Sequence, residues 1–337
     1  MSFPYEIKDL DPETSREMST HFSGGREGYV QVGPEKYLIG SIYRNQAAGY
    51  YNMELRDDDL WVVTFPRSGT TWMQELAWLI KNDLDYDTAS KKMLIERYAF
   101  LEVSMLLTKV LMKELIEESH HDPKCINALK MMSEPGYDAA AKMTSPRHFK
   151  THLPLSLLPP KLLDTCKVIY VARNPKDVVL SYYYHNRKYK SIGFESDMKT
   201  YWDFFKRGLT FWSPFWSHVN EAWERRNHPN LLFIFYEDMK KDLPGSIRKV
   251  SQFLNKKMND DQVAQLASHL DIKNFKSNPM IDTLPEELKG IEKEGEESFI
   301  RQGRSGQWEE SFTPDMKKEA DEWIKKHENK TDLRFRV

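Results

Sequence analysis

The sequence predicts an α/β fold in which a central parallel sheet is flanked by helices. Four short apolar runs, each rich in Val, Ile, Phe or Tyr, have the composition of buried strands, and segments with helical periodicity separate them. These runs are residues 60–65 (LWVVTF), 147–152 (RHFKTH), 167–172 (KVIYVA) and 231–236 (LLFIFY). The 337-residue chain has no internal repeats and no linker-like tracts, so we expect one domain over residues 1–337.

The composition favours a globular protein of a reducing compartment. With 40% hydrophobic and 30% charged residues the chain can form a full core, and its net charge of −2 argues against nucleic acid as a partner. Two cysteines, Cys125 and Cys166, provide neither a disulfide framework nor a metal-ligand pattern, so we expect no metal. Because there is no signal-like N-terminus and no membrane-length apolar stretch, we expect a soluble cytoplasmic protein.

The first predicted strand leads into the most informative segment of the chain. The residues before this strand are rich in turn formers and are interpreted as irregular. After the strand, a short loop precedes a helix whose apolar side carries Trp72, Leu76, Leu79 and Ile80. A strand, a loop of small residues and a helix together direct backbone N–H groups and a positive helix end at an anion.

The loop itself adds side-chain donors to this predicted anion site. It consists of Pro66, Arg67, Ser68, Gly69, Thr70 and Thr71. The three hydroxyl groups supply hydrogen bonds, and the guanidinium group supplies a fixed charge. A full P-loop also requires an earlier glycine and a lysine, both of which are missing. The alternative interpretation is therefore an ordinary helix start capped by Ser or Thr.

A long segment at about residues 101–146 separates the first two predicted strands. Its first part, residues 101–118, carries apolar side chains at helical intervals, namely Leu101, Met105, Leu106, Val110, Leu111 and Leu115. The second part mixes turn signals with methionines. The segment is either a pair of connecting helices or a lid over a ligand site. We favour the lid because the apolar content is high.

The second predicted strand ends in Lys150-Thr151-His152. Residues at positions i and i+2 of a strand share a face, so Lys150 and His152 are expected to point the same way. An imidazole can take a proton from a hydroxyl group near neutral pH, and an ammonium group can stabilise charge on a transferred group. A lone histidine is more often structural, but beside this lysine and the anion loop we interpret His152 as a catalytic base.

The third predicted strand ends in Arg173, just before a helix that is expected to begin at Pro175. An arginine at this position can bind a phosphate in bidentate fashion, with Ser181 two turns into the helix. A local ion pair with Asp177 is the alternative. A further basic, glycine-containing loop at residues 299–308 is weak evidence of binding by itself.

Five segments, in this order, resemble the cytosolic sulfotransferase family. They are TFPRSGTTW (64–72), KTHLPLSLLP (150–159), YVARNPKDVVLSYY (170–183), FYEDMKKD (235–242) and FIRQGRSGQW (299–308). The resemblance implies a single α/β domain related to nucleotide kinases (P-loop-kinase-like). It also implies transfer of a sulfuryl group from 3′-phosphoadenosine 5′-phosphosulfate (PAPS, which leaves as PAP) to a hydroxyl group or an amine.

The resemblance assigns roles to individual positions. It implies that the 5′-phosphosulfate is held by Arg67, Ser68, Gly69, Thr70 and Thr71. Trp72 would stack on the adenine, and Tyr236 would lie on the adenine side. The 3′-phosphate would be held by Arg173, Ser181, Arg301, Gln302 and Gly303. His152 would be the base, and Lys150 would stabilise the moving sulfuryl group.

Three departures from the family pattern limit what is carried over. Arg67 stands where lysine is usual, which leaves its catalytic role purely electrostatic. The segment at 270–275 differs from the usual Thr-Ser-Phe pattern, so its adenine contacts are left open. The family's dimer motif has a lysine, a Thr-Val pair and a glutamate at set spacing. The corresponding positions here are Glu309, Thr313-Pro314 and Lys318, so the oligomeric state is left open.

The acceptor is expected to be a lipophilic alcohol. Tyr98, Phe100 and Phe149 are interpreted as walls of an apolar cavity. The hydroxyl group of Tyr98 is also interpreted as a group that steers the reaction. Phe211 and Trp212 are interpreted as core residues. The long insert resembles that of the insect retinol dehydratase branch of the family, which implies retinol as acceptor and its dehydration to anhydroretinol after sulfation. The alternatives are a phenol or steroid sulfotransferase without dehydration, a nucleotide kinase, and a non-catalytic lipophile carrier.

Overall fold

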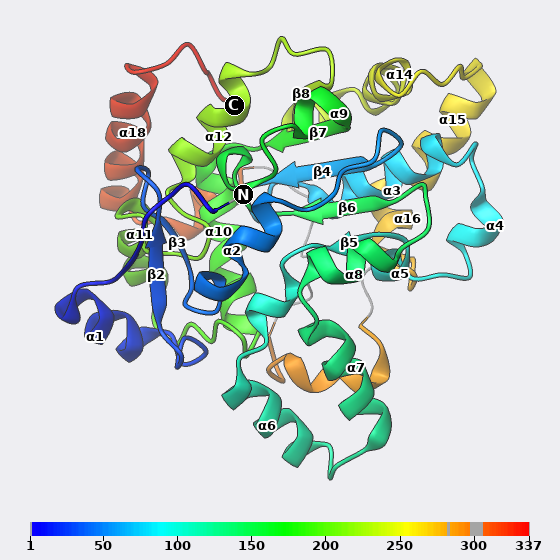
Figure 1. The fold of residues 1–337 in the computed structure, drawn as a ribbon. Coiled ribbons are helices and arrows are strands. Elements are labelled where there is room, and N and C mark those ends of the chain that lie inside the picture. The colour runs from blue at the N-terminus through cyan, green and yellow to red at the C-terminus, as the bar shows by residue number, and fades with distance from the viewer. Residues whose placement is uncertain (1, 282–283, 297–305, 337) are drawn as a thin grey trace.

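A five-stranded parallel sheet lies at the centre of the protein, which confirms the predicted α/β class (Figure 1). The computed structural model describes residues 2–281, 284–296 and 306–336. In spatial order the strands are β5 (Ala99–Phe100), β6 (His148–Thr151), β4 (Leu60–Thr64), β7 (Lys167–Ala172) and β8 (Leu231–Phe235). The four longer strands lie where the apolar runs predicted them. The two-residue β5 was not predicted, because its composition does not distinguish it from a turn.

Helices cover both faces of this sheet, as the unbroken apolar character of its strands requires. Leu60 and Val62 face one core, and Trp61 and Val63 face the other, because successive side chains of a strand alternate. The first core lies against α3 (Thr70–Lys81), α14 (Leu243–Phe253) and α15 (Asp260–His269). The second lies against α10 (Pro175–Lys188), α11 (Met198–Lys206) and α12 (Phe215–Glu224).

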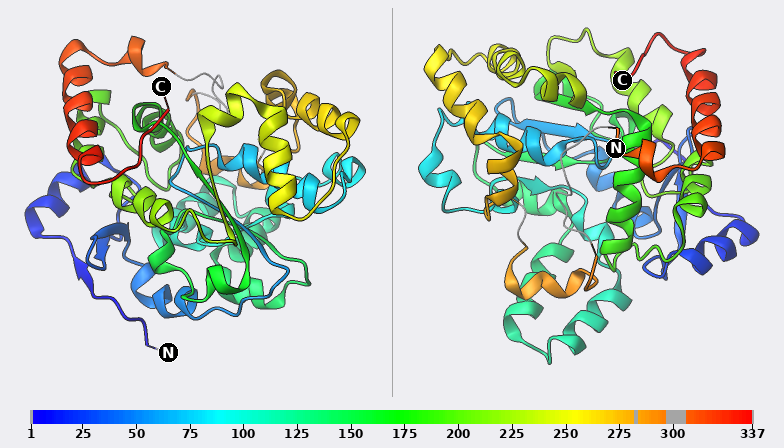
Figure 2. Two further views of the ribbon diagram at one scale, coloured as in Figure 1. Left: turned by 90° about the horizontal axis from the view of Figure 1, so that it is seen from above. Right: turned by 180° about the vertical axis from the view of Figure 1, so that it is seen from behind.

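The remaining helices connect or extend these layers (Figure 2). They are α1 (Pro12–His21), α2 (Tyr43–Tyr51), α4 (Tyr86–Ala89), α5 (Leu94–Arg97), α6 (Lys109–Glu118), α7 (Pro123–Ser133), α8 (Gly136–Lys142), α9 (Leu162–Thr165), α13 (Tyr236–Lys241), α16 (Ile272–Ser277), α17 (Trp308–Ser311), α18 (Pro314–Glu328) and the 3₁₀ turns η1 (Val103–Leu106), η2 (Leu155–Leu157) and η3 (Glu286–Ile291). Pro314 occupies the first turn of α18, where proline is tolerated, and Thr313 caps that helix.

The N-terminal stretch is ordered, so its interpretation as irregular is wrong. It forms a three-stranded antiparallel sheet of β1 (Ile7–Asp9), β2 (Tyr29–Val32) and β3 (Tyr37–Gly40). These strands have only three or four residues each, which is too short for their alternation to stand out in the sequence. Gly33, at a φ of 70°, begins the turn that joins β2 to β3.

The long segment between β4 and β6 builds a lobe that projects from the sheet. Helices α6 and α7 pack with η3, which comes from a distant part of the chain, and Figures 1 and 2 show the three side by side. Their shared core consists of Leu107, Leu111, Leu115, Cys125, Leu129, Leu288 and Ile291. The predicted helical periodicity is confirmed over Lys109–Glu118. It is wrong before that helix, where η1 forms, and at Val110, which is 38% exposed.

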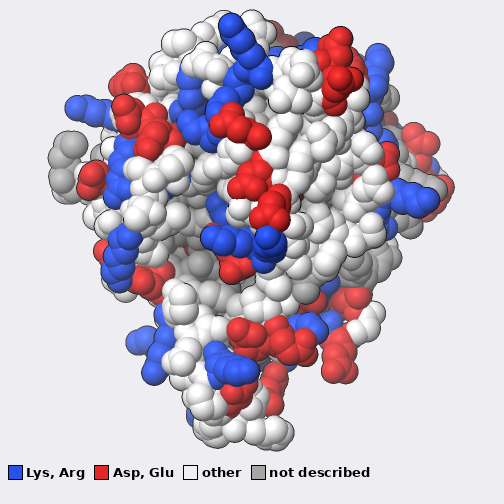
Figure 3. Space-filling view, turned by 90° about the vertical axis from the view of Figure 1, so that its right-hand side faces the viewer, with Lys and Arg blue, Asp and Glu red and all other residues white. Residues whose placement is uncertain are grey.

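The surface carries charges of both signs. On the face drawn in Figure 3, Lys and Arg side chains are interspersed with Asp and Glu, and neither sign dominates. Among the helices that the structure describes, none combines the length and the apolar character needed to cross a bilayer.

A buried ion pair joins the segments that lead into β4 and β6. Arg147 Nε and Nη2 donate to the two carboxylate oxygens of Asp59 at 2.8 and 2.6 Å, and both side chains are at most 1% exposed. The guanidinium group also donates to the carbonyl oxygens of Ala140 and Glu54. This bidentate pair therefore aligns the two strands whose other ends border the site described below.

We expect Asp59→Ala to destabilise the protein by about 3–5 kcal/mol, because it leaves a buried guanidinium group without its counter-charge. Urea unfolding measures the effect. The matched control is Asp87→Ala, which removes an exposed i,i+4 partner of Lys91 and should cost at most about 1 kcal/mol. Equal effects for the two variants would contradict this account of the buried pair.

Candidate active site

The loop between β4 and α3 has a backbone shape that glycine makes possible. Gly69 has a φ of 101°, and a Cβ atom at this position would lie 2.7 Å from Tyr236 Cδ2. Arg67 also lies in the left-handed region, at a φ of 66°. The loop therefore turns tightly into α3, whose first backbone N–H groups have no intrahelical acceptor.

Most of the predicted loop residues border one cavity of about 300 Å³. Arg67, Gly69, Thr70 and Thr71 line it, and Thr70 Oγ1 lies 2.7 Å from Thr64 Oγ1. Ser68 differs: its side chain is fully buried, its hydroxyl oxygen has no hydrogen-bond partner among the described residues, and it does not line the cavity. The role of Ser68 as a side-chain donor stays a prediction.

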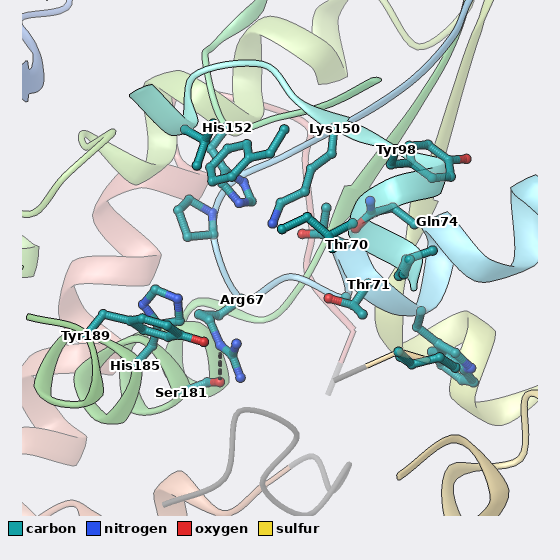
Figure 4. Close-up of a pocket in the computed structure, with 18 of the residues that line it drawn as sticks. Arg67, Thr70, Thr71, Gln74, Tyr98, Lys150, His152, Ser181, His185 and Tyr189 are labelled. Carbon is teal, nitrogen blue, oxygen red and sulfur yellow. Dashed lines mark hydrogen bonds between the residues drawn. The ribbon is translucent and has the colours of Figure 1, made fainter. Parts of the chain in front are cut away.

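Two guanidinium groups and a hydroxyl group meet beside the loop. Arg67 Nε donates to Ser181 Oγ at 3.0 Å, as Figure 4 shows, and Arg173 Nη1 donates to the carbonyl oxygen of Arg67 at 3.1 Å. Asp177, the alternative partner proposed for Arg173, accepts the backbone N–H of Gly306 at 2.9 Å. Two fixed positive charges next to a helix N-terminus make this end of the cavity suited to a multiply charged anion.

An aromatic group borders the same end of the cavity. Arg173 stacks over the ring of Tyr236 at 4.4 Å, and Trp72 meets that ring edge-on at 5.7 Å. Trp72 Nε1 donates to the carbonyl oxygen of Leu270. Ile272 and Phe275, from the segment that the sequence left open, also line the cavity. The arrangement can hold a flat ring next to the anion site.

His152 lies at the end of β6, where a hydrogen bond orients its ring. Nδ1 is 2.9 Å from the carbonyl oxygen of Thr64, which can only accept, so Nδ1 carries the proton and Nε2 of the neutral ring is bare. Burial, reinforced by the charge of Lys150, holds the pKa of His152 well below its ordinary 6.5. At neutral pH the ring is thus an uncharged base that lines the cavity (Figure 4).

Lys150 lines the cavity together with His152, as the strand periodicity predicted. Burial lowers the pKa of Lys150 to about 8; the charge of Arg67 acts in the same direction, and Glu102 opposes it. The side chain is therefore mostly an ammonium group at pH 7. Its Nζ lies 4.2 Å from the centre of the Phe100 ring, which also lines the cavity.

Glu102 supports this strand end, and sequence reasoning missed it. One carboxylate oxygen accepts the backbone N–H of His152, and the other accepts Thr151 Oγ1 at 2.7 Å. Burial raises the pKa of Glu102 to about 7, although both hydrogen bonds act in the opposite direction. No signal in the sequence separates this glutamate from the others, because its partners are some 50 positions away.

The rest of the cavity wall is largely apolar. Its apolar residues include Leu94, Tyr98, Phe100, Val103, Leu106, Leu107, Met132, Trp212, Ile281, Leu284 and Ile291. Trp212 is interpreted from sequence as core; it is 2% exposed, yet it also lines the cavity and meets the His152 ring edge-on at 5.2 Å. The cavity thus combines a cationic end with an apolar region, and the side chains of His152 and Lys150 line this same cavity.

Two predicted acceptor residues differ from expectation. The Tyr98 ring lines the cavity, but its hydroxyl group points away from Lys150 and His152 (Figure 4), which does not support a steering role. Phe149 does not line the cavity, so the expectation that it forms a wall is wrong. It packs on Trp61, with the ring centres 4.6 Å apart, in the second core. Alternate residues of β6 face opposite sides of the sheet, so Phe149 points away from the side of Lys150.

Arg301, Gln302 and Gly303 lie outside the described residues. Two side chains that were not predicted also line the cavity: His185, four residues after Ser181 on α10, and Tyr189, which follows the end of that helix. Among the described residues, no cluster of His, Cys, Asp and Glu side chains has the arrangement of a metal site.

Comparisons with known proteins agree on one family. The family model described as the sulfotransferase domain matches residues 57–332. Luciferin sulfotransferase from Photinus pyralis is 34% identical over 88% of this chain and 79% of that protein. Two crystal structures of retinol dehydratase are 38% identical, each with a TM-score of 0.92. The complex with androsterone and the inactive cofactor PAP covers 99% of both chains, and the complex with retinol and PAP covers 100% of both.

We expect Glu102 to make the stability of the protein depend on pH. The folded carboxyl group keeps its proton up to about pH 7, whereas the unfolded group loses it near its ordinary pKa of 4.5. Unfolding in this interval releases a proton, so stability falls as pH rises. Relative to Glu102→Gln, the wild type should lose about 3 kcal/mol of unfolding free energy between about pH 4 and pH 7.5.

Urea unfolding of both proteins at several pH values measures this difference. A constant difference between wild type and Glu102→Gln across the interval would show that the carboxyl group has the same pKa in the folded and unfolded states.

Proposed function

This chain belongs to the sulfotransferase family, and we propose that it transfers a sulfuryl group from PAPS to the hydroxyl group of a lipophilic alcohol. One observation carries the proposal: the neutral imidazole of His152 lies beside the Lys150 ammonium group in a cavity with a cationic end and an apolar region. The first region suits a nucleotide, and the second suits an apolar acceptor.

The residues present fit the donor nucleotide. The tight turn at Gly69 exposes the N-terminus of α3, which is a binding site for phosphate-like groups. Arg67, Arg173 and Ser181 would hold the charged groups, and Trp72 and Tyr236 would hold the adenine. Once bound, the nucleotide supplies the sulfuryl group. Arg301, Gln302 and Gly303, which lie outside the described residues, are proposed to hold the 3′-phosphate as well.

His152 is the proposed general base. Its Nε2 would take the proton of the acceptor hydroxyl group while the acceptor oxygen forms its bond to sulfur, the bond from sulfur to the phosphate oxygen of the donor breaks, and PAP leaves. The Nδ1–H···O=C bond to Thr64 keeps the ring in the tautomer in which Nε2 is bare. Lys150 and Arg67 would stabilise the negative charge that shifts during transfer. Arg67 stays charged throughout, so its proposed role is electrostatic only.

Retinol is the acceptor that we propose first. The two retinol dehydratase structures support it, since they match this chain over nearly its whole length. In the dehydration that this assignment entails, the C–O bond of the sulfate ester breaks and its electron pair leaves with sulfate. The polyene spreads the resulting cation, and loss of a proton from carbon gives anhydroretinol. We propose that the segment at about 101–146 acts as a lid over this acceptor, since Leu106, Leu107 and Met132 line the cavity.

A steroid alcohol is the second candidate acceptor, because one of those structures contains androsterone. A phenol is a further alternative; in either case the sulfate ester itself would be the product. A non-catalytic carrier would bind the lipophile and transfer nothing. A nucleotide kinase is disfavoured by the missing P-loop lysine. The proposed location is the cytoplasm, where the two free and buried thiols would stay reduced.

The His152→Ala variant tests the chemistry. We expect it to lower kcat by about 10²-fold or more, which is the usual contribution of a general base, while PAP still binds. Turnover is measured with sulfur-labelled PAPS, and nucleotide binding is measured by thermal shift with PAP against ATP. Full activity in this variant would remove His152 from the role of base. A larger thermal shift with ATP than with PAP would favour a kinase.

Product analysis tests the acceptor. We expect incubation with PAPS and retinol to give anhydroretinol, inorganic sulfate and PAP in equal amounts, measured by mass spectrometry and ion chromatography. Androsterone and a simple phenol are run in parallel. A stable retinyl sulfate would contradict the dehydration. Turnover of only the steroid or the phenol would reassign the acceptor, and tight retinol binding without turnover would favour the carrier.

A further inference from the structure

A second buried histidine contacts His152 through the backbone. His218, on α12, is 0% exposed, and its Nε2 lies 2.8 Å from the carbonyl oxygen of His152. Since a carbonyl oxygen only accepts, Nε2 of His218 must carry the proton and donate it. His218 is absent from the lining of the cavity, so it has no direct contact with a ligand there.

Tyr170, on β7, contacts the other ring nitrogen of His218. Its hydroxyl group lies 2.8 Å from Nδ1 of His218, and this nitrogen is bare once Nε2 carries the proton. Tyr170 is therefore the donor in this hydrogen bond. Burial keeps the pKa of His218 low, at about 4, so the ring stays neutral and its two hydrogen bonds keep the same direction at neutral pH. Phe65 packs edge-on against the ring at 5.6 Å and limits its rotation.

The position of His152 in the chain explains why this contact matters. Strand β6 ends at Thr151, so the sheet ladder does not hold the peptide groups of His152. Its N–H group is held by Glu102, its carbonyl group by His218, and its Nδ1–H group by Thr64. Three of its four polar groups are thus fixed by other parts of the chain, and Nε2 is the fourth.

We propose that His218, oriented by Tyr170, is a positioning residue that holds the backbone of His152 so that Nε2 faces the acceptor hydroxyl group. This inference rests on the proposed function of His152 as base. Positioning has a large effect on rate, because a displacement of about 1 Å at a reacting group can cost about 10²-fold. His218 acts through His152 and takes no proton from the substrate.

Substitutions at His218 test the proposal. We expect His218→Leu to lower kcat by about 10²-fold, with little change in the KM for PAPS, because the donor site does not involve His218. His218→Gln should recover most of the loss, since its side-chain amide can still donate to the carbonyl oxygen of His152. A merely structural role would make both variants equally defective, and would lower stability and nucleotide affinity as well as kcat.

A matched pair of tyrosine variants separates positioning from the general loss of a buried hydroxyl group. Tyr170→Phe should lower kcat by about 2- to 10-fold, which corresponds to one neutral hydrogen bond. The control is Tyr201→Phe, which removes a buried hydroxyl group on α11 that accepts a hydrogen bond from Asn186. This control should leave kcat unchanged. Equal losses of kcat in the two variants would contradict the relay through Tyr170.

A readout that does not depend on turnover distinguishes failure of this inference from failure of the proposed function. In protein labelled with ¹⁵N-histidine, we expect long-range ¹H–¹⁵N spectra to show His152 in the single Nδ1–H tautomer, assigned with His152→Ala. His218→Leu should give a mixture of tautomers. If the wild type turns over no acceptor but this change is seen, the proposed function fails and the positioning stands. Unchanged spectra and unchanged kcat in a folded His218→Leu protein would overturn the inference.

Discussion

The hydrogen bond from His152 Nδ1 to the carbonyl oxygen of Thr64 connects the two halves of this site. Thr64 ends β4 and leads into the loop that carries Arg67, whereas His152 directly follows β6. Because the two strands are neighbours in parallel register, their carboxyl ends meet at one edge of the sheet. The bond selects the ring tautomer and also sets the distance between the proposed base and the proposed donor loop.

Low exposure controls the charges around that bond. Burial lowers the pKa values of His152 and Lys150 and raises that of Glu102, so near pH 7 the site holds a neutral imidazole beside an ammonium group. If these side chains were exposed to water, their pKa values would stay closer to the ordinary values of each group. A base that is uncharged and a cation that is still protonated are what the proposed transfer of an anionic group needs.

The lobe shows how the cavity is closed by parts of the chain that are distant in sequence. Helices α6 and α7 come from the segment before β6, whereas η3 follows α16 much later in the chain. The three elements nevertheless share one small core. Ile291 of η3 belongs to that core and also lines the cavity. Ion pairs join residues 292–296 to α10, including Lys188 with Glu292 at 3.1 Å. The core that α6 and α7 share with η3 is thus connected to the helix that carries Ser181.

The sequence alone determined the sheet class, the positions of four strands, and the loop and strand ends that carry Arg67, Lys150 and His152. These features depend on residues close together in the chain, where periodicity and turn chemistry act directly. Only the tertiary structure decided that Glu102 and His218 hold His152 and that the short N-terminal segments form a sheet. Such contacts depend on the register between distant segments, and a local pattern of hydrophobic and polar residues contains no information about which distant partner it will meet.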